Sequence, residues 1–299
     1  MLSYLVAMLT FAGLYMLMAL GLNIIWGMAG MINLGLVGFF GVGAYVSALL
    51  TLKAGVPIAL GCLAGMAAAA VAGAIVAVVT ARLRGDYLAI VTLGFSETVR
   101  LVASNEIWLT NGTDGISGIP GPFRGVLPPE TFSLVFLALL AVVVALAVLA
   151  LDRLRHSPFG RVLRAIRDDD QVAAVAGKRV LLFKVEAFVV GAAIIGLAGA
   201  LYGHYTSFVA PDLLAPLITI YIVLALSAGG IGNNWGAVAG ALLVVFFLES
   251  TRFLKDALPF LKPVQIAATR EFIVAAGLIL VLRFRPQGLI PERLPRSAP

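Results

Sequence analysis

Long apolar stretches, separated by short polar or glycine-rich segments, follow one another along the whole chain. They cover residues 4–27, 34–52, 57–80, 87–103, 131–151, 181–203, 214–228, 236–250 and 267–284. A membrane-spanning helix needs about 20 mostly apolar residues, so these stretches predict about nine spans; eight to ten are allowed because several are short or broken by glycine. The pattern predicts an all-α, polytopic transmembrane helical bundle in which residues 1–299 form one transmembrane domain.

Composition supports a membrane protein and argues against an enzyme. Hydrophobic residues make up 61% of the chain and charged residues only 12%, about half the charged fraction of a soluble domain. The single cysteine, Cys62, excludes an internal disulfide, and only two histidines, His156 and His204, are present. We find no metal-ligand spacing and no phosphate-binding loop, and we expect neither a cofactor nor nucleic-acid binding.

The basic residues predict which loops face the cytoplasm. They cluster after residue 80, in loop 152–180 and after residue 282, and such clusters mark the cytoplasmic face of a membrane protein. Loops 104–130 and 204–213 then fall outside. Segment 251–266 should also lie outside, yet it carries three basic residues, so an amphipathic helix at the membrane surface is one interpretation. The side of the N-terminus stays open, because the chain has no charged side chain before Lys53.

Loop 152–180 has the signals of a helix–turn–helix. Ser157 and Pro158 are a typical helix start, followed by a helix to about Arg167. The aspartates 168–170 can cap a second, short helix that ends at Gly177. A structured cytoplasmic element of this kind suits docking into a groove on another protein. A solvated connector is the alternative, and the residues alone do not decide between the two.

Two glycine-rich segments interrupt the apolar pattern. Residues 27–35 either line a path through the membrane, as broken helices do in transporters, or form a tight turn at the surface. Asn23 and Asn33 are candidates to line such a path. Residues 229–236 predict a tight cytoplasmic turn that carries the interfacial Trp235.

The stretch 87–103 carries polar side chains within a span. Glu97 and Arg100 are three residues apart, and a self-neutralising ion pair near the outer end of the helix is the favoured interpretation. Thr92 and Ser96 are uncharged and more plausibly face the protein interior. The outer loop that follows, 110–120, could receive a partner or simply cover the bundle.

Several motifs, taken in order, resemble one family, the permease subunits of branched-chain amino-acid ABC importers of the LivM type. They are residues 27–45, which end in Phe-Phe-Gly-Val-Gly-Ala-Tyr; 82–93; 113–120; 157–161; 164–168; 229–236; and 284–289. Each motif is weak alone, and together they extend over nearly the whole chain.

The resemblance implies roles for the segments singled out above. Loop 157–177 would be the coupling loop to the ATPase subunits, with contributions from Ser157, Pro158, Gly160, Arg161, Arg164, Arg167, Asp168, Gln171, Ala173 and Gly177. The path through the membrane would be lined by Asn23, Asn33, Thr92 and Ser96. Gln171 stands where such loops usually carry Glu, and Met31, Asn33 and Leu36 stand where the family tends to have Gln, Ser and His.

The resemblance also implies partners and a location. A multi-pass subunit of the bacterial inner membrane would act with a second related permease, two ATPase subunits, an external substrate-binding protein and membrane lipid. The expected substrates are branched-chain amino acids. Urea, short amides and aromatic acids are alternatives within the same architecture, and an ion-coupled secondary transporter is the rival from another class.

Overall fold

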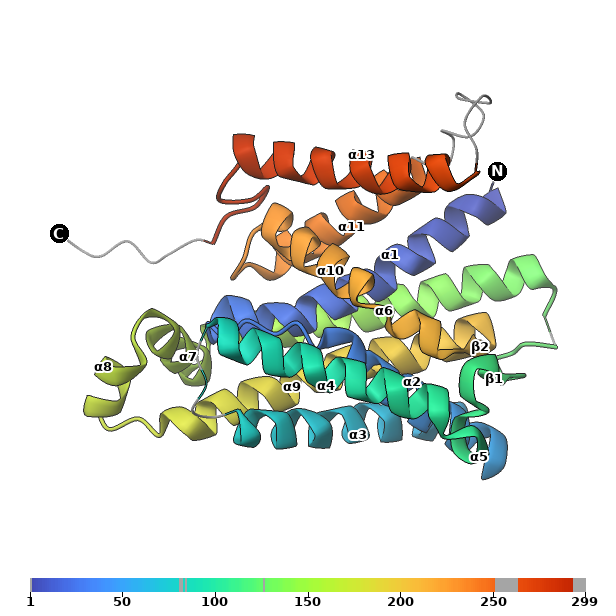
Figure 1. Cartoon of the computed structure of the whole chain (residues 1–299), viewed down its shortest axis with the longest axis horizontal. Helices are drawn as coiled ribbons and strands as arrows, with labels where there is room; N and C mark the ends of the chain where they lie inside the picture. Colours follow the sequence, from blue (N-terminus) through green and yellow to red (C-terminus); the bar gives the residue numbers. More distant parts are fainter. Residues whose placement is uncertain (1, 81–82, 84, 126, 251–262, 293–299) are drawn as a thin grey trace.

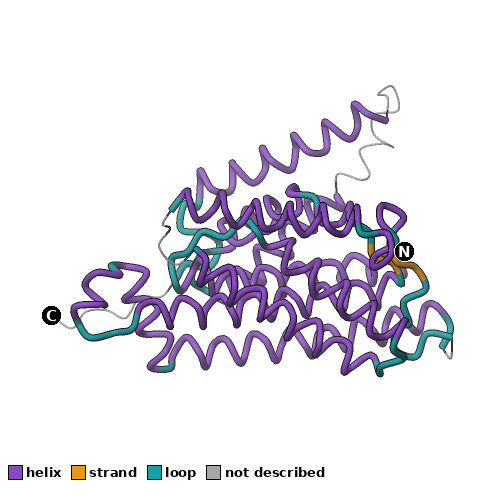
Figure 2. The backbone as a smooth tube through the Cα atoms, turned by 60° about the horizontal axis from the view of Figure 1, so that its bottom comes forward, coloured by secondary structure: helices purple, strands orange, loops and turns teal. Residues whose placement is uncertain are grey.

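The computed structural model describes residues 2–80, 83, 85–125, 127–250 and 263–292. Long helices run roughly along one axis and form a bundle, with the short helices α7 and α8 at one end and α5, β1 and β2 at the other (Figure 1). Figure 2 shows that the described chain is helical nearly throughout and that its strands lie at one end only. The predicted all-α architecture is confirmed.

Nine apolar helices match the nine predicted stretches within the described residues. They are α1 (Leu2–Leu22), continued by the π-helix η1 (Asn23–Met28), α2 (Leu36–Lys53), α3 (Ile58–Val79), α4 (Asp86–Asn105), α6 (Pro129–His156), α9 (Val180–Thr206), α10 (Pro216–Gly229), α11 (Asn234–Ser250) and α13 (Pro263–Phe284). Six of these, from α1 to α9, are long and apolar enough to cross a membrane. The last three are shorter apolar helices or, in α13, have a shorter apolar core.

Helices α2, α3 and α9 form the most closely packed part of the core, and glycine makes this packing possible. A Cβ atom on Gly43 of α2 would lie 2.1 Å from the carbonyl oxygen of Gly196 in α9. A Cβ atom on Gly199 would lie 2.0 Å from the carbonyl oxygen of Phe40. No side chain fits at these distances, so the two backbones touch, as small residues allow between helices in membranes.

The two ends of the bundle agree with the predicted sides of the loops. The outer loops 104–130 and 204–213 lie together, because strand β1 (Ile116–Ser117) pairs antiparallel with β2 (Phe208–Val209). The short helix α5 (Ile107–Thr110) and the 3₁₀ turns η2 (Gly112–Asp114) and η3 (Pro211–Leu214) complete these loops. Helices α7 (Pro158–Asp168) and α8 (Asp170–Val175) lie at the opposite end (Figure 1).

The structure also places the N-terminus, which the sequence left open. Figure 1 shows the start of α1 at the end of the bundle opposite α7 and α8. The Tyr4 hydroxyl donates a 2.6 Å hydrogen bond to Glu249 near the end of α11, which holds these two helix ends together. The expected surface helix at 251–266 falls mostly outside the described residues, and its last residues, from Pro263, belong to α13.

Candidate functional site

The helix pair α7–α8 is built by the caps that the sequence predicts. The Ser157 hydroxyl accepts a hydrogen bond from the Gly160 amide at 3.3 Å, and Pro158 occupies the first turn of α7. Asp169 caps α8 by accepting from the Gln171 and Val172 amides at 2.8 and 3.1 Å. Gly177 has a φ of +77°, the left-handed backbone that ends a helix at glycine. The predicted helix–turn–helix is confirmed.

Two of the predicted coupling arginines hold this helix pair against the end of α6. Arg161 donates to the carbonyl oxygen of His156 at 3.0 Å, and Arg164 donates to that of Arg155 at 3.4 Å. A Cβ atom on Gly160 would lie 2.4 Å from the Leu154 carbonyl oxygen, so α7 starts in backbone contact with α6. Basic side chains at a helix C-terminus satisfy its free carbonyl groups. These two arginines therefore hold α7 against the last turn of α6.

Arg167 joins the helix pair to the first span. Its Nη1 atom donates to the carbonyl oxygen of Gly27, at the end of η1, over 2.6 Å, and to Oε2 of Glu292 over 2.8 Å. A Cβ atom on Gly30 would lie 2.9 Å from the Arg167 side chain, so the backbone at residue 30 also packs on it. A charge-assisted hydrogen bond thus connects α7 to the end of the first span.

Asn23 lies next to the contact between Arg167 and Gly27, in a buried hydrogen-bond network that crosses the bundle. Its side-chain oxygen accepts from the Gly232 amide at 2.8 Å, and its amide donates to Asn234 at 2.9 Å. Asn234 in turn donates to Asp152 of α6 at 2.8 Å. Asn23 is fully buried. Its role in a translocation path remains a prediction, and in this structure its side chain connects η1 to the turn at residues 229–236.

The other three predicted path residues lie together where residues 29–35 cross α4. The Leu34 amide donates to the Thr92 hydroxyl at 3.0 Å. Asn33 accepts from the Gly35 amide, while its buried Nδ2 atom has no hydrogen-bond partner in the described part of the chain. Thr92 and Ser96 are buried in the face of α4 that packs against α2. Ala29 and Gly30 turn at the end of η1, where Gly30 is exposed and has a φ of +73°, and residues 31–35 continue as a largely buried, non-helical segment that leads into α2.

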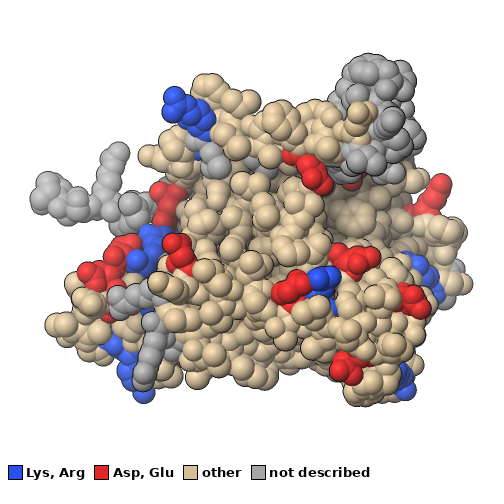
Figure 3. All heavy atoms as spheres, viewed as in Figure 1, with Lys and Arg blue, Asp and Glu red and all other residues tan. Residues whose placement is uncertain are grey.

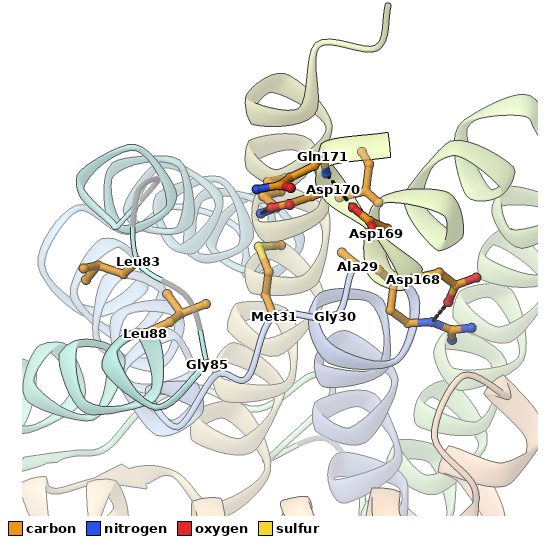
Figure 4. A pocket seen from close by; sticks show the side chains of 13 residues that line it. Ala29, Gly30, Met31, Leu83, Gly85, Leu88, Asp168, Asp169, Asp170 and Gln171 are labelled. Carbon is orange, nitrogen blue, oxygen red and sulfur yellow. Dashed lines mark hydrogen bonds and ion pairs between the residues drawn. The ribbon is translucent and has the colours of Figure 1, made fainter. Parts of the chain in front are cut away.

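A polar pocket of about 420 Å³ lies between residues 29–31 and the helix pair. Figure 4 shows Leu83, Gly85 and Leu88 on one side of the pocket and residues 168–171 on the other, with Met31 between them. Lys184 of α9 binds Asp170 at 3.0 Å and fixes the start of α8 at the pocket wall. The pocket therefore separates α4 from the coupling helices at the level of Arg167.

The opposite face of the helix pair is open. A groove of about 580 Å³ lies between α7 and α8, with Arg161 and Lys178 at its edges. Val172 and Val175 are 65% and 90% exposed, whereas Ala173 is only 4% exposed because it packs between the two helices. Asp168 and Asp169 also line the groove, and an exposed apolar tip beside charges of both signs is a surface suited to another protein.

Two residues that make contacts in this site, Glu292 and Asp152, were not predicted from the sequence. Glu292 binds Arg167 and lies 3.7 Å from Arg155, and Asp152 receives the Asn234 amide. Asp152 had one usable signal, since a carboxylate at the inner end of a long apolar run needs a partner. Glu292 follows a segment that contains Pro286 and Pro291, and no signal in the sequence marked it as a site residue.

The predicted pair on α4 is present. Nε and Nη2 of Arg100 donate to the two carboxylate oxygens of Glu97 at 2.9 and 2.5 Å. About a third of each side chain is exposed, 33% for Arg100 and 38% for Glu97. The pair lies in the second half of the 20-residue helix α4, the half nearer its outer end.

Several known proteins are similar to this chain over most of its length. The family model described as "Branched-chain amino acid transport system / permease component" matches residues 4–282. The permease protein LivM of Salmonella typhimurium is 32% identical, over 96% of this chain and 70% of the relative. A probable LivM of Methanocaldococcus jannaschii is 30% identical over 94% and 91%. LivH of Salmonella typhimurium is 27% identical over 94% and 92%. No solved structure matches the chain.

Proposed function

This chain belongs to the permease components of branched-chain amino acid transport systems, and we propose that it is one membrane subunit of an ATP-driven importer in a bacterial inner membrane. It is a multi-pass permease and not an enzyme. The whole chain, 1–299, would act as one permease unit, with residues 152–180 as its coupling loop. ATP would be hydrolysed on separate subunits.

The observation that carries this proposal is the position of Arg167. The helix pair α7–α8 offers an exposed apolar tip to a cytoplasmic partner, while Arg167 on its inner side binds the carbonyl oxygen of Gly27. Coupling between two sites requires an element that both can bias. A rigid helix pair, capped at both ends and fixed to the first span, meets that requirement.

Similarity to two kinds of permease supports a paired assembly. The chain resembles LivM proteins and, at lower identity, a LivH protein over nearly its full length. A fold shared by two permeases suits a pseudo-symmetric pair that encloses the path. We propose a LivH-like second permease, two ATPase subunits and an external binding protein as the partners.

The names of the relatives favour branched-chain amino acids as the substrate. Urea, short amides and aromatic acids remain alternatives that the same architecture could carry. An ion-coupled transporter working alone is the rival mechanism. The ionic groups around Arg167 bind one another and the coupling loop, which supports the ATP-driven mechanism.

Reconstitution tests the proposal. The chain, its partners and the binding protein are placed in liposomes, and leucine uptake is measured with ATP inside. Uptake should require ATP and both permeases, and Val175→Asp should abolish it because a charge then meets the partner's surface. Val175→Thr, which keeps the shape of the side chain, is the control.

Uptake by this chain alone, driven by an ion gradient without ATP, would contradict the proposal. Equal leucine uptake by Val175→Asp and Val175→Thr would place the docking surface elsewhere.

A further inference from the structure

A groove of about 790 Å³ lies on the side of the bundle, between α4 and the start of α10. Figure 3 shows acidic and basic atoms gathered side by side over α4. The charged groups that line the groove are Glu97, Arg100 and Asp212. Ile90, Leu93, Ala215 and Pro216 provide an apolar wall.

This groove lies at membrane depth. Helix α10 has only 14 residues, about 21 Å at 1.5 Å per residue, and Figure 1 shows that it starts well inside the length of the bundle. The short 3₁₀ segment η3, which carries Asp212, therefore enters the membrane region. Irregular backbone and charge at that depth are tolerated where protein buries them or where they line a watery cavity.

The charges in the groove do not balance. Arg100 gives Nε and Nη2 to Glu97, which leaves Nη1 for a further acceptor. Asp212 is close enough to Arg100 to interact electrostatically, but it has no ion-pair partner among the described residues. Two carboxylates thus face one guanidinium, and the groove has a net negative charge that a cationic group would neutralise.

Two buried hydroxyl groups without partners lie on helices next to the groove. The Tyr45 hydroxyl of α2 is buried, feels the charge of Asp212, and has no hydrogen-bond partner in the described chain. The buried hydroxyl of Thr219, one turn after Pro216 in α10, also lacks one. Buried polar groups normally have partners, so these two hydroxyls leave hydrogen-bonding capacity unused near Asp212 and Pro216.

We propose that this groove is a transient site for a zwitterionic aliphatic amino acid on its way through the membrane. The ammonium group would bind Asp212, the carboxylate would take the free Nη1 of Arg100, and the side chain would lie on the apolar wall. This inference rests on the proposed function and specifies its substrate class. Urea carries no charge to balance Asp212, and an aromatic acid would be repelled by the excess carboxylate.

Gly94 offers a probe within the groove. It lines the cavity, and a Cβ atom built on it meets nothing within 4 Å, so cysteine fits there without displacing a neighbour. Because Cys62 is the only cysteine, Cys62→Ala gives a clean background. Val71→Cys, on the exposed side of α3 at 61% exposure, is the matched control.

The experiment measures modification of the two cysteines by a charged methanethiosulfonate reagent in the complete importer. Labelling is read on this chain by mass spectrometry, with and without leucine, 4-methylvalerate or urea. We expect Gly94→Cys to react at least tenfold faster than Val71→Cys. Leucine should slow the reaction severalfold, whereas 4-methylvalerate, which lacks the ammonium group, and urea should not. Asp212→Asn should remove the protection by leucine.

The outcomes separate this inference from the proposed function. If Gly94→Cys reacts as slowly as Val71→Cys, or if leucine never slows it, the groove is not a substrate site, even where ATP-driven leucine uptake by the wild type stands. Protection by urea or 4-methylvalerate equal to that by leucine would overturn the zwitterion assignment. Absence of ATP-driven uptake by the wild type would count against the proposed function instead.

Discussion

Arg167 donates a hydrogen bond of 2.6 Å to the carbonyl oxygen of Gly27, across 140 residues of sequence. Gly27 lies in η1, where a π-helical turn ends the first span. Such turns hold their backbone hydrogen bonds less regularly than an α-helix and recur at functional sites. The contact thus joins a capped helix pair to the π-helical end of the first span.

Replacing Arg167 by Gln should uncouple ATP hydrolysis from transport. The change removes the charge that binds Glu292 and weakens the bond to Gly27, at a cost of about 1.5–3 kcal/mol for a charge-assisted contact. We expect leucine uptake to fall about tenfold or more, while ATP hydrolysis by the assembled importer continues. Arg153→Gln, at an exposed position on α6, is the control. Parallel losses of uptake and hydrolysis would argue against a coupling role.

Gly177→Ala should loosen the coupling loop locally. The φ of +77° costs an alanine about 1–2 kcal/mol, although the position has room for its methyl group. Amide exchange over residues 170–179 should rise about fivefold or more, measured by mass spectrometry. Asn tolerates this backbone better, so Gly177→Asn should exchange more slowly than Gly177→Ala. The same exchange for both would show that the backbone angle is not the cause.

Asn23→Leu should destabilise the bundle without changing its packing volume greatly. The Gly232 amide and the Asn234 side chain would lose their buried partner, which costs about 1–3 kcal/mol for each group left unsatisfied. A lower midpoint of thermal unfolding in detergent is the expected result. Asn105→Ala, at the exposed end of α4, should leave the midpoint nearly unchanged. An unaltered midpoint for Asn23→Leu would mean that water replaces the amide.

Thr92→Val should loosen the contact between α4 and segment 29–35, because it removes the hydroxyl oxygen of Thr92. Valine keeps the shape of threonine but removes the acceptor of the Leu34 amide, a loss of about 1–3 kcal/mol at a buried site. Leucine uptake should fall severalfold, and Thr92→Ser, which retains the hydroxyl, should transport nearly as well as the wild type. Equal uptake by the Val and Ser variants would separate this contact from transport.

Local signals in the sequence were sufficient for the helices and for the coupling loop. Apolar length fixes the spans, because lipid leaves few alternatives to a helix. Ser157, Asp169 and Gly177 fix the helix pair, because capping depends on neighbours within a few residues. The two-residue strands were missed, since pairing of Ile116 with Val209 depends on the tertiary fold.

The contacts that define the site lie beyond such signals. Arg167 and Glu292 were each visible as charges, but nothing in the sequence pairs residues 125 apart. The same holds for Asn23 and Asn234, which are 211 residues apart. In the sequence Asp212 looks like an ordinary loop aspartate. Only the structure shows that η3 places it beside α4.

The position of Glu292 has a consequence for how the protein is made. A ribosome releases α7 into the cytoplasm long before residue 292 is synthesised, and α9, α10, α11 and α13 must be inserted in between. Throughout that interval Arg167 has the carboxylate of its neighbour Asp168 but lacks that of Glu292. A nascent permease therefore acquires the Arg167–Glu292 ion pair last, after the carboxyl-terminal segment packs against the end of α10.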